Sequence, residues 1–144
     1  MQKKYHICLI TSCIKPNTSS GPITKFTKEE RIKQLTDNLN YLLGTKLFRN
    51  IYLVDPFLTN EENIKKFKSD LLENGLIELN NISYLIFNPN KKTQSIINKR
   101  GKGYSELKMI IKSNMTIKKN HKKSIVHKIS GRYKILNIEE IVKR

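Results

Sequence analysis

The chain has 144 residues, a length that fits one domain and leaves no room for several independently folded modules. Hydrophobic residues make up 38% and charged residues 28%, so the composition allows a buried core and excludes wholesale disorder. The formal net charge of +16 attracts polyanions, which include nucleic acid, anionic lipid headgroups and phosphorylated small molecules.

The positive charge is concentrated in residues 91–134. This segment contains twelve Lys and two Arg against one acid, Glu106, which gives a net charge of +13. The first ninety residues carry 12 basic and 9 acidic side chains, a net charge of only +3. The location of the charge is more informative than its total, because Lys, Ile and Asn are enriched in the products of AT-rich genomes.

Strand and helix patterns alternate from the first residues onward. Residues 5–14 are apolar on both alternating faces, which predicts a strand covered on both sides. A helix is expected over 27–44, because Thr27–Glu30 has the capping-box pattern and a stripe of Ile and Leu residues follows at spacings of three and four. Gly44 stands where this helix should stop.

The same alternation continues to the end of the chain. We expect strands at 50–55, 82–87 and 124–130, and helices at 59–75, 103–115 and 137–144. A second capping box is expected at Thr59–Glu62, and a lysine-rich loop is expected over 88–103.

The alternation predicts a single α/β domain over 1–144, with a mostly parallel sheet and helices on both faces. Ligands of such sheets bind outside the carboxyl ends of the strands. The loops at this edge are expected at 11–26, 55–58, 88–103 and 130–133. Because the last helix begins as the sequence stops, we expect the chain to be truncated at its C-terminus.

The stretch Asn98–Glu106 is the most informative candidate site. Gly101 and Gly103 allow a ligand to approach the backbone at the start of a helix, and Arg100 and Lys102 add positive charge. This combination suits a phosphate or pyrophosphate, although neither a Walker loop nor a complete GxGxxG motif is present. A solvated basic turn is the alternative.

Two further candidates follow predicted strands. Gly131 permits a tight turn, Arg132 can bind a phosphate or carboxylate, and Tyr133 can stack on a base or sugar. Asp55 can bind a ribose or a base edge. The alternatives are an exposed turn at 130–133 and an Asx turn or cap at Asp55.

Other classes of site are not supported. The sequence has no apolar run as long as a membrane span and no targeting signal. Cys8 and Cys13 are poorly spaced for a disulfide within one strand, which favours a reducing cytoplasm, and with His6 they lack a fourth zinc ligand. None of the three histidines has a Ser or Cys partner in the pattern of a catalytic triad.

A resemblance extends over nearly the whole chain. Ile10–Ser12, Glu30–Leu35, Leu53–Asp55, Arg100–Glu106 and Lys128–Tyr133 together resemble bacterial glycosyltransferases of cell-surface (capsular or lipo-) polysaccharide synthesis, which are similar to GT-A-type enzymes. The specific parts are RGKGYSE and KISGRY. The resemblance implies a GT-A or Rossmann-like domain that binds a nucleotide-sugar donor and transfers the sugar to a glycan or lipid-linked acceptor.

The resemblance also implies where the donor lies. Thr11, Ser12 and Asp55 are expected near the nucleoside, and the RGKGYSE loop, with Glu106, near the pyrophosphate and sugar. Many such enzymes hold a divalent cation with an Asp-x-Asp motif, which this sequence lacks, so dependence on a metal is left open. Lys102 and Arg132 can supply the positive charge directly. We expect a cytoplasmic protein, with peripheral contact to the anionic inner face of the membrane.

Two other functions compete with a glycosyltransferase. The basic segment 91–134 suits a nucleic-acid-binding module, but it offers only Tyr104 and Tyr133 for stacking and matches no helix-turn-helix, KH or RRM signature. An inactive, truncated remnant is the third reading.

Overall fold

The structure is a computed structural model that describes residues 5–15 and 26–143. Its strands are β1 (Tyr5–Thr11), β2 (Asn50–Val54), β3 (Ile82–Leu85) and β4 (Ser124–Ser130), and its helices are α1 (Lys28–Thr45), α2 (Glu61–Glu73), α3 (Lys91–Arg100), α4 (Lys102–Asn120) and α5 (Ile138–Lys143). The strands form one all-parallel sheet in the order β3-β2-β1-β4. The predicted α/β fold with a parallel sheet is confirmed.

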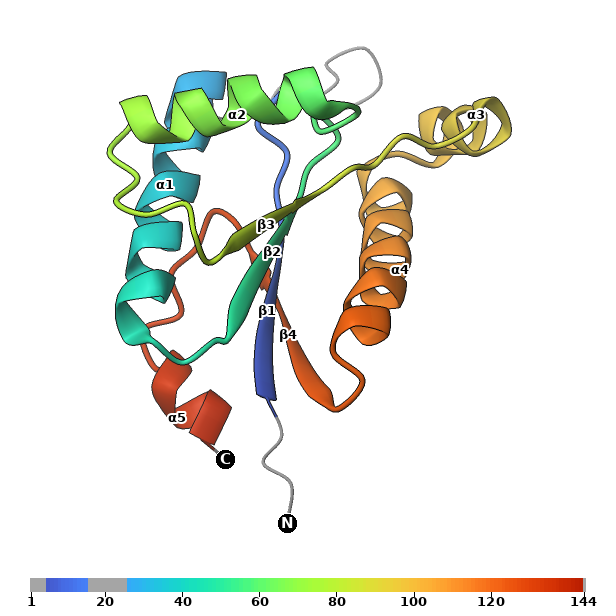
Figure 1. The fold of residues 1–144 in the computed structure, drawn as a ribbon. Coiled ribbons are helices and arrows are strands. Elements are labelled where there is room, and N and C mark those ends of the chain that lie inside the picture. Colours follow the sequence, from blue (N-terminus) through green and yellow to red (C-terminus); the bar gives the residue numbers. More distant parts are fainter. Residues whose placement is uncertain (1–4, 16–25, 144) are drawn as a thin grey trace.

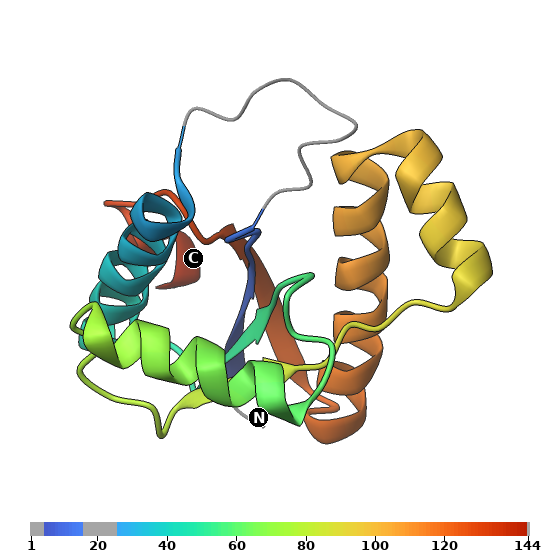
Figure 2. The ribbon, with the colours of Figure 1, turned by 90° about the horizontal axis from the view of Figure 1, so that it is seen from above.

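Helices cover both faces of the sheet, as predicted. Figure 1 shows α1, α2 and α5 on one side and α4 on the other, and the view from above in Figure 2 shows the same separation. Each face has its own core. Cys8 and Ile10 of β1 pack toward α1 and α2, whereas Ile7 and Leu9 pack toward α4, so β1 is apolar on both faces because both are buried.

Three predicted strands end earlier than expected, and β2 does so by one residue, at Val54. β1 ends at Thr11 rather than at residue 14, because the next residues leave the sheet and the Ile14 N–H donates to the side chain of Asp55. β3 ends at Leu85 rather than at residue 87, because the Phe87 N–H donates to the carbonyl of Leu58 in a neighbouring loop. Apolar composition alone does not distinguish these buried loop residues from strand residues.

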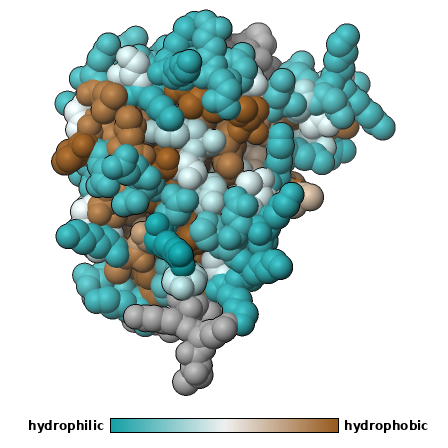
Figure 3. Space-filling view, viewed as in Figure 1, coloured by the Kyte–Doolittle hydropathy of each residue, from teal (hydrophilic) through white to brown (hydrophobic). Residues whose placement is uncertain are grey.

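The predicted lysine-rich loop 88–103 is wrong in its middle part, which forms α3. The helix begins after Asn90, whose side chain accepts a hydrogen bond from the Thr93 N–H at 2.8 Å. No residue of α3 is buried, so the helix lacks the apolar stripe by which the other helices were predicted. In Figure 3 the arm that contains α3 is mostly hydrophilic. The following helix, α4, is also longer than the predicted 103–115.

Side-chain caps fix the starts of α1 and α2. Thr27 accepts a hydrogen bond from the Glu30 N–H at 3.1 Å, which confirms the first capping box. The second prediction is off by one residue, because Asn60 caps α2 by accepting from the Asn63 N–H. Thr59 instead accepts a hydrogen bond from the Asn63 side chain.

Gly101 forms the sharp junction between α3 and α4. Its backbone has φ +84° and ψ −163°. This conformation is open to glycine but strained for any residue with a Cβ atom. The Gly101 N–H closes α3 by donating to the Ile97 carbonyl, and its own carbonyl accepts from the Ser105 N–H in α4. One glycine therefore ends the first helix and starts the second.

The Gly101→Ala substitution should lower the free energy of unfolding by about 1–3 kcal/mol, because alanine is strained in this conformation. Gly103→Ala is the matched control, since Gly103 lies within α4 and a Cβ there meets nothing within 4 Å. It should change stability by less than about 1 kcal/mol, and in the stabilising direction. Urea denaturation of both variants measures the difference, and equal stabilities would show that the junction is unstrained.

Candidate functional site

A cavity of about 190 Å³ opens at the carboxyl ends of β1 and β4, beside the first turns of α4. Its walls combine strand ends, the β2–α2 loop and two helices. The lining residues are Thr11, Ser12, Cys13, Arg31, Pro56, Lys102, Ser105, Glu106, Met109, Ser130, Gly131 and Arg132. This is the edge at which open parallel sheets bind ligands.

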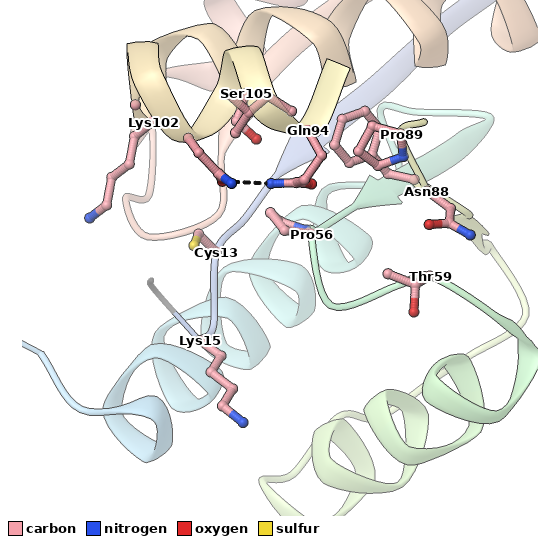
Figure 4. A pocket seen from close by; sticks show the side chains of 13 residues that line it. Cys13, Lys15, Pro56, Thr59, Asn88, Pro89, Gln94, Lys102 and Ser105 are labelled. Atoms are coloured by element: carbon pink, nitrogen blue, oxygen red, sulfur yellow. Dashed lines mark hydrogen bonds between the residues drawn. The ribbon is translucent and has the colours of Figure 1, made fainter. Parts of the chain in front are cut away.

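A second cavity of about 200 Å³ adjoins the first and shares Cys13, Pro56, Lys102 and Ser105 with it. Figure 4 shows its other walls, which come from the loop after β2, the loop after β3, and α3. Apolar surface alternates with amide groups here. The Gln94 amide donates a 2.9 Å hydrogen bond to Asn98 Oδ1, one turn further along α3. The helix that sequence patterns missed thus forms one wall of this cavity.

Most of the candidate residues lie together. Those that line the first cavity are Thr11, Ser12, Lys102, Glu106, Gly131 and Arg132. Gly101 lines the adjoining cavity. Arg100 and Gly103 line neither, since the Arg100 guanidinium lies over the Tyr104 ring and Gly103 is exposed in the first turn of α4. The role of the clustered residues in donor binding stays a prediction.

Asp55 lies beneath the first cavity and is almost fully buried. One carboxylate oxygen accepts from Ser12 Oγ at 2.6 Å and from the Ile14 N–H at 3.0 Å, and the other accepts from the Phe57 N–H at 2.8 Å. Burial raises the pKa of Asp55, against the effect of these three hydrogen bonds, which lower it. With both oxygens engaged, Asp55 holds the segment after β1 in position, the structural alternative to a ribose contact.

Asp55→Ala should unfold the site edge at a cost of about 3 kcal/mol or more, because it leaves two buried N–H groups and a hydroxyl without an acceptor. The matched control is Asp37→Ala, which removes the same charge from an exposed position on α1 and should change stability by less than about 0.5 kcal/mol. Chemical denaturation followed by circular dichroism compares the two. A stability loss no greater than that of the control would refute the assigned role.

Glu106 is neutralised within the cavity. Its carboxylate accepts hydrogen bonds from Lys128 Nζ at 2.5 Å and from Thr11 Oγ1 at 2.9 Å. The bond to Lys128 is the main reason that the pKa of Glu106 is lowered, with a smaller contribution from Thr11 and against an opposing effect of burial. Since the side chains of Glu106 and Lys128 are 43% and 36% exposed, water screens the pair. The pair links α4 to β4 and to the end of β1.

Replacing Lys128 with Met should raise the pKa of Glu106 toward its ordinary value of 4.5. A lowered carboxyl pKa adds stability above the unfolded-state value and loses it as the pH falls through the folded-state value. The variant should therefore lose less stability than the parent when the pH is lowered from 6 to about 3. Carboxyl NMR titration measures the pKa directly, and an unchanged value would show that Lys128 does not act on Glu106.

Three cationic residues line the first cavity. Arg31 is buried, and its guanidinium donates to the carbonyls of Cys13 and Phe26. Lys102, in the first turn of α4, and Arg132, just after β4, are both exposed. The pKa of Cys13 is raised, chiefly by burial and then by Asp55, while Arg31, Lys102 and Arg132 all act to lower it. All three positive charges therefore act on the same part of the cavity.

Two polar residues of α1 that the sequence did not single out shape the site. Besides Arg31, the buried Asn38 donates from Nδ2 to the carbonyls of Ser130 and Tyr133 at 3.0 and 3.1 Å. Gly131 packs so closely that a Cβ would lie 3.0 Å from Leu35 Cδ1 and 3.2 Å from Ser12 Cβ. The available signal was the position of Arg31 and Asn38 on the apolar stripe of α1.

Residues 5–15 and 26–143 contain neither a cluster of metal ligands nor a membrane-spanning helix. No group of three or more His, Cys, Asp or Glu side chains there could hold a metal ion. No helix in those ranges combines the length and apolar character needed to cross a bilayer. Comparisons with protein-family models, curated proteins and solved structures give no match to this chain.

Proposed function

We propose that this edge of the sheet binds the diphosphate of a nucleotide sugar, and that the protein is a glycosyltransferase, or its donor-binding part, in surface polysaccharide synthesis. The observation that carries the proposal is the convergence of Lys102, Arg132 and the start of α4 on one cavity. Gly101 provides no capping side chain, and no acid stands in the first turn of α4. This helix end therefore favours an anion through its N–H groups and its dipole.

The chemistry of the first cavity fits a diphosphate. The two acids closest to it are already engaged, Glu106 by Lys128 and Asp55 by three hydrogen bonds, so the cations meet little competing charge. The Ser130 hydroxyl adds a neutral donor along the wall, whereas Ser12 Oγ already donates its proton to Asp55. On this proposal Lys102 and Arg132 stabilise the charge that develops on the leaving diphosphate.

The adjoining cavity suits the nucleoside. Pro56 and Pro89 provide apolar surface, and the side chains of Asn88 and Gln94 provide amide donors and acceptors that can pair with a base edge. The two cavities share a wall, as a ligand with linked base and diphosphate requires. The acceptor, a glycan or lipid-linked glycan in this proposal, would approach from the side of the sugar.

Lys102→Ala and Arg132→Ala should each weaken the binding of a nucleoside diphosphate, or of its sugar, by roughly tenfold to a hundredfold, because each removes a charge-assisted contact. Both side chains are exposed, so the melting temperature should change little. Lys99→Ala is the matched control, since it removes the same charge from the same segment outside both cavities. Calorimetry with UDP-, GDP- and CMP-sugars, and with the monophosphates as weaker ligands, measures the affinities.

Cys13 reports where a ligand binds. It lines both cavities, whereas Cys8 is buried and has its pKa raised to about 12. A bound nucleotide should slow the alkylation of Cys13 at mildly alkaline pH. If no nucleotide binds at millimolar concentration while short RNA binds tightly at physiological salt, the nucleic-acid function replaces this proposal. If neither binds and the protein melts near room temperature, the inactive remnant is the better account.

A further inference from the structure

Helix α4 carries apolar residues on two different sides. Met109 and Ile117 are buried against the sheet, together with Ser113. Leu107, Ile111 and Met115 recur at intervals of four residues, and they are 51%, 48% and 70% exposed. These three residues, which we term the outer stripe, form a line on one face of the helix because residues four apart are neighbours.

Lysines run beside the outer stripe. Lys108 and Lys112 each follow a stripe residue by one position, and the 100° step of an α-helix sets them along the same border. Lys119 continues this border toward the end of α4 and is exposed. Neighbouring α3 adds exposed basic residues, namely Lys91, Lys92, Lys99 and Arg100. Glu106 is the sole acid in the two helices, and it is paired with Lys128 on the cavity side.

An aromatic side chain stands at the N-terminal end of this surface. The Tyr104 ring has the Arg100 guanidinium at 5.6 Å and the Lys108 ammonium at 5.4 Å from its centroid. Tyr side chains with an apolar ring and a polar tip favour the boundary between water and hydrocarbon. Apolar, cationic and aromatic groups thus occupy one side of a 19-residue helix.

We propose that the outer stripe and its lysines dock the protein on the surface of an anionic lipid bilayer. Such helices lie in the membrane plane, with apolar side chains at the headgroup boundary and Lys or Arg on the anionic headgroups. The phosphates of RNA would bind the lysines, but RNA would leave Leu107, Ile111 and Met115 without an apolar partner. In a dimer through this surface, two basic segments, each of net charge +13, would face and repel one another. The observations favour the bilayer.

The test uses the full chain and vesicles of phosphatidylcholine with or without about a third of phosphatidylglycerol, in a flotation assay. A triple variant with Leu107→Ser, Ile111→Ser and Met115→Ser should bind the anionic vesicles at least tenfold more weakly. Ile77→Ser combined with Leu136→Ser is the matched control, because these residues are 83% and 84% exposed elsewhere on the surface. The control should leave binding unchanged.

A second variant separates charge from apolar contact and carries the test if the triple Ser variant fails to fold. Lys108→Gln with Lys112→Gln should weaken binding by about thirtyfold, since each lysine near an anionic surface contributes about 1 kcal/mol. Lys33→Gln with Lys65→Gln makes the same charge change at exposed positions of α1 and α2 and should have a much smaller effect.

Several results would overturn the membrane proposal. The proposal would be wrong if the protein bound neutral and anionic vesicles equally well. It would also be wrong if neither variant reduced vesicle binding more than its control does. Binding to short RNA but not to vesicles would assign the lysines to nucleic acid. A dimer in analytical ultracentrifugation that the triple Ser variant dissociates would show that the outer stripe is a self-association surface. None of these outcomes bears on nucleotide binding, which the Lys102 and Arg132 variants test separately.

Discussion

The buried carboxylate of Asp55 is the interaction on which the ligand-binding edge depends. A chain that leaves a parallel sheet must find new partners for its backbone N–H groups. Asp55, directly after β2, meets this need for Ile14 and Phe57 and also fixes Ser12. Burying a carboxylate is costly, and three hydrogen bonds offset the cost. The floor of the first cavity is thus built by a residue that does not itself line it.

The negative charge that lines the first cavity is neutralised, whereas Lys102 and Arg132 have no acidic partner among the ion pairs of the described residues. Lys128 and Thr11 hold Glu106, so the one acid of the basic segment contributes little negative field. Arg31 is fixed by two backbone carbonyls and brings its charge from the opposite side of the sheet edge. Lys102 and Arg132 stay exposed, and the Arg132 guanidinium lies over the Tyr133 ring at 5.5 Å from its centroid. The arrangement keeps a positive field at a concave site, where low-dielectric walls strengthen it.

The sequence predicted those elements whose residue pattern is recognisable over a few neighbouring residues. The strand 124–130 matches β4, and the Thr27 cap and apolar stripe located α1, because short-range patterns determine both. Helix α3 was missed because its apolar residues are only Ile96 and Ile97, too few for a stripe, and Ile97 is only partly buried against the core. Shared location of the loops at one sheet edge was predictable from parallel topology, which is why RGKGYSE and KISGRY residues converge.

Other features of the site depend on contacts that no local pattern encodes. Asn38 bonds to the turn after β4, more than ninety residues away in sequence, and Arg31 bonds to the segment after β1. For Asp55 the sequence allowed both a ligand contact and a cap, and only the count of its hydrogen-bond donors favours the cap. Polar residues on the buried face of a helix are the sign by which such contacts can be sought.

Helix α4 joins the two proposals physically. Its N-terminus borders the first cavity, its buried side packs on β1 and β2, and its outer stripe is directed away from the sheet. A helix lying in the plane of a bilayer would hold the N-terminal cavity near the headgroups, because both belong to one rigid element. An acceptor attached to lipid would then meet the donor without leaving the membrane, and a water-soluble acceptor would gain nothing. The two proposals together therefore favour a lipid-linked acceptor over a free glycan.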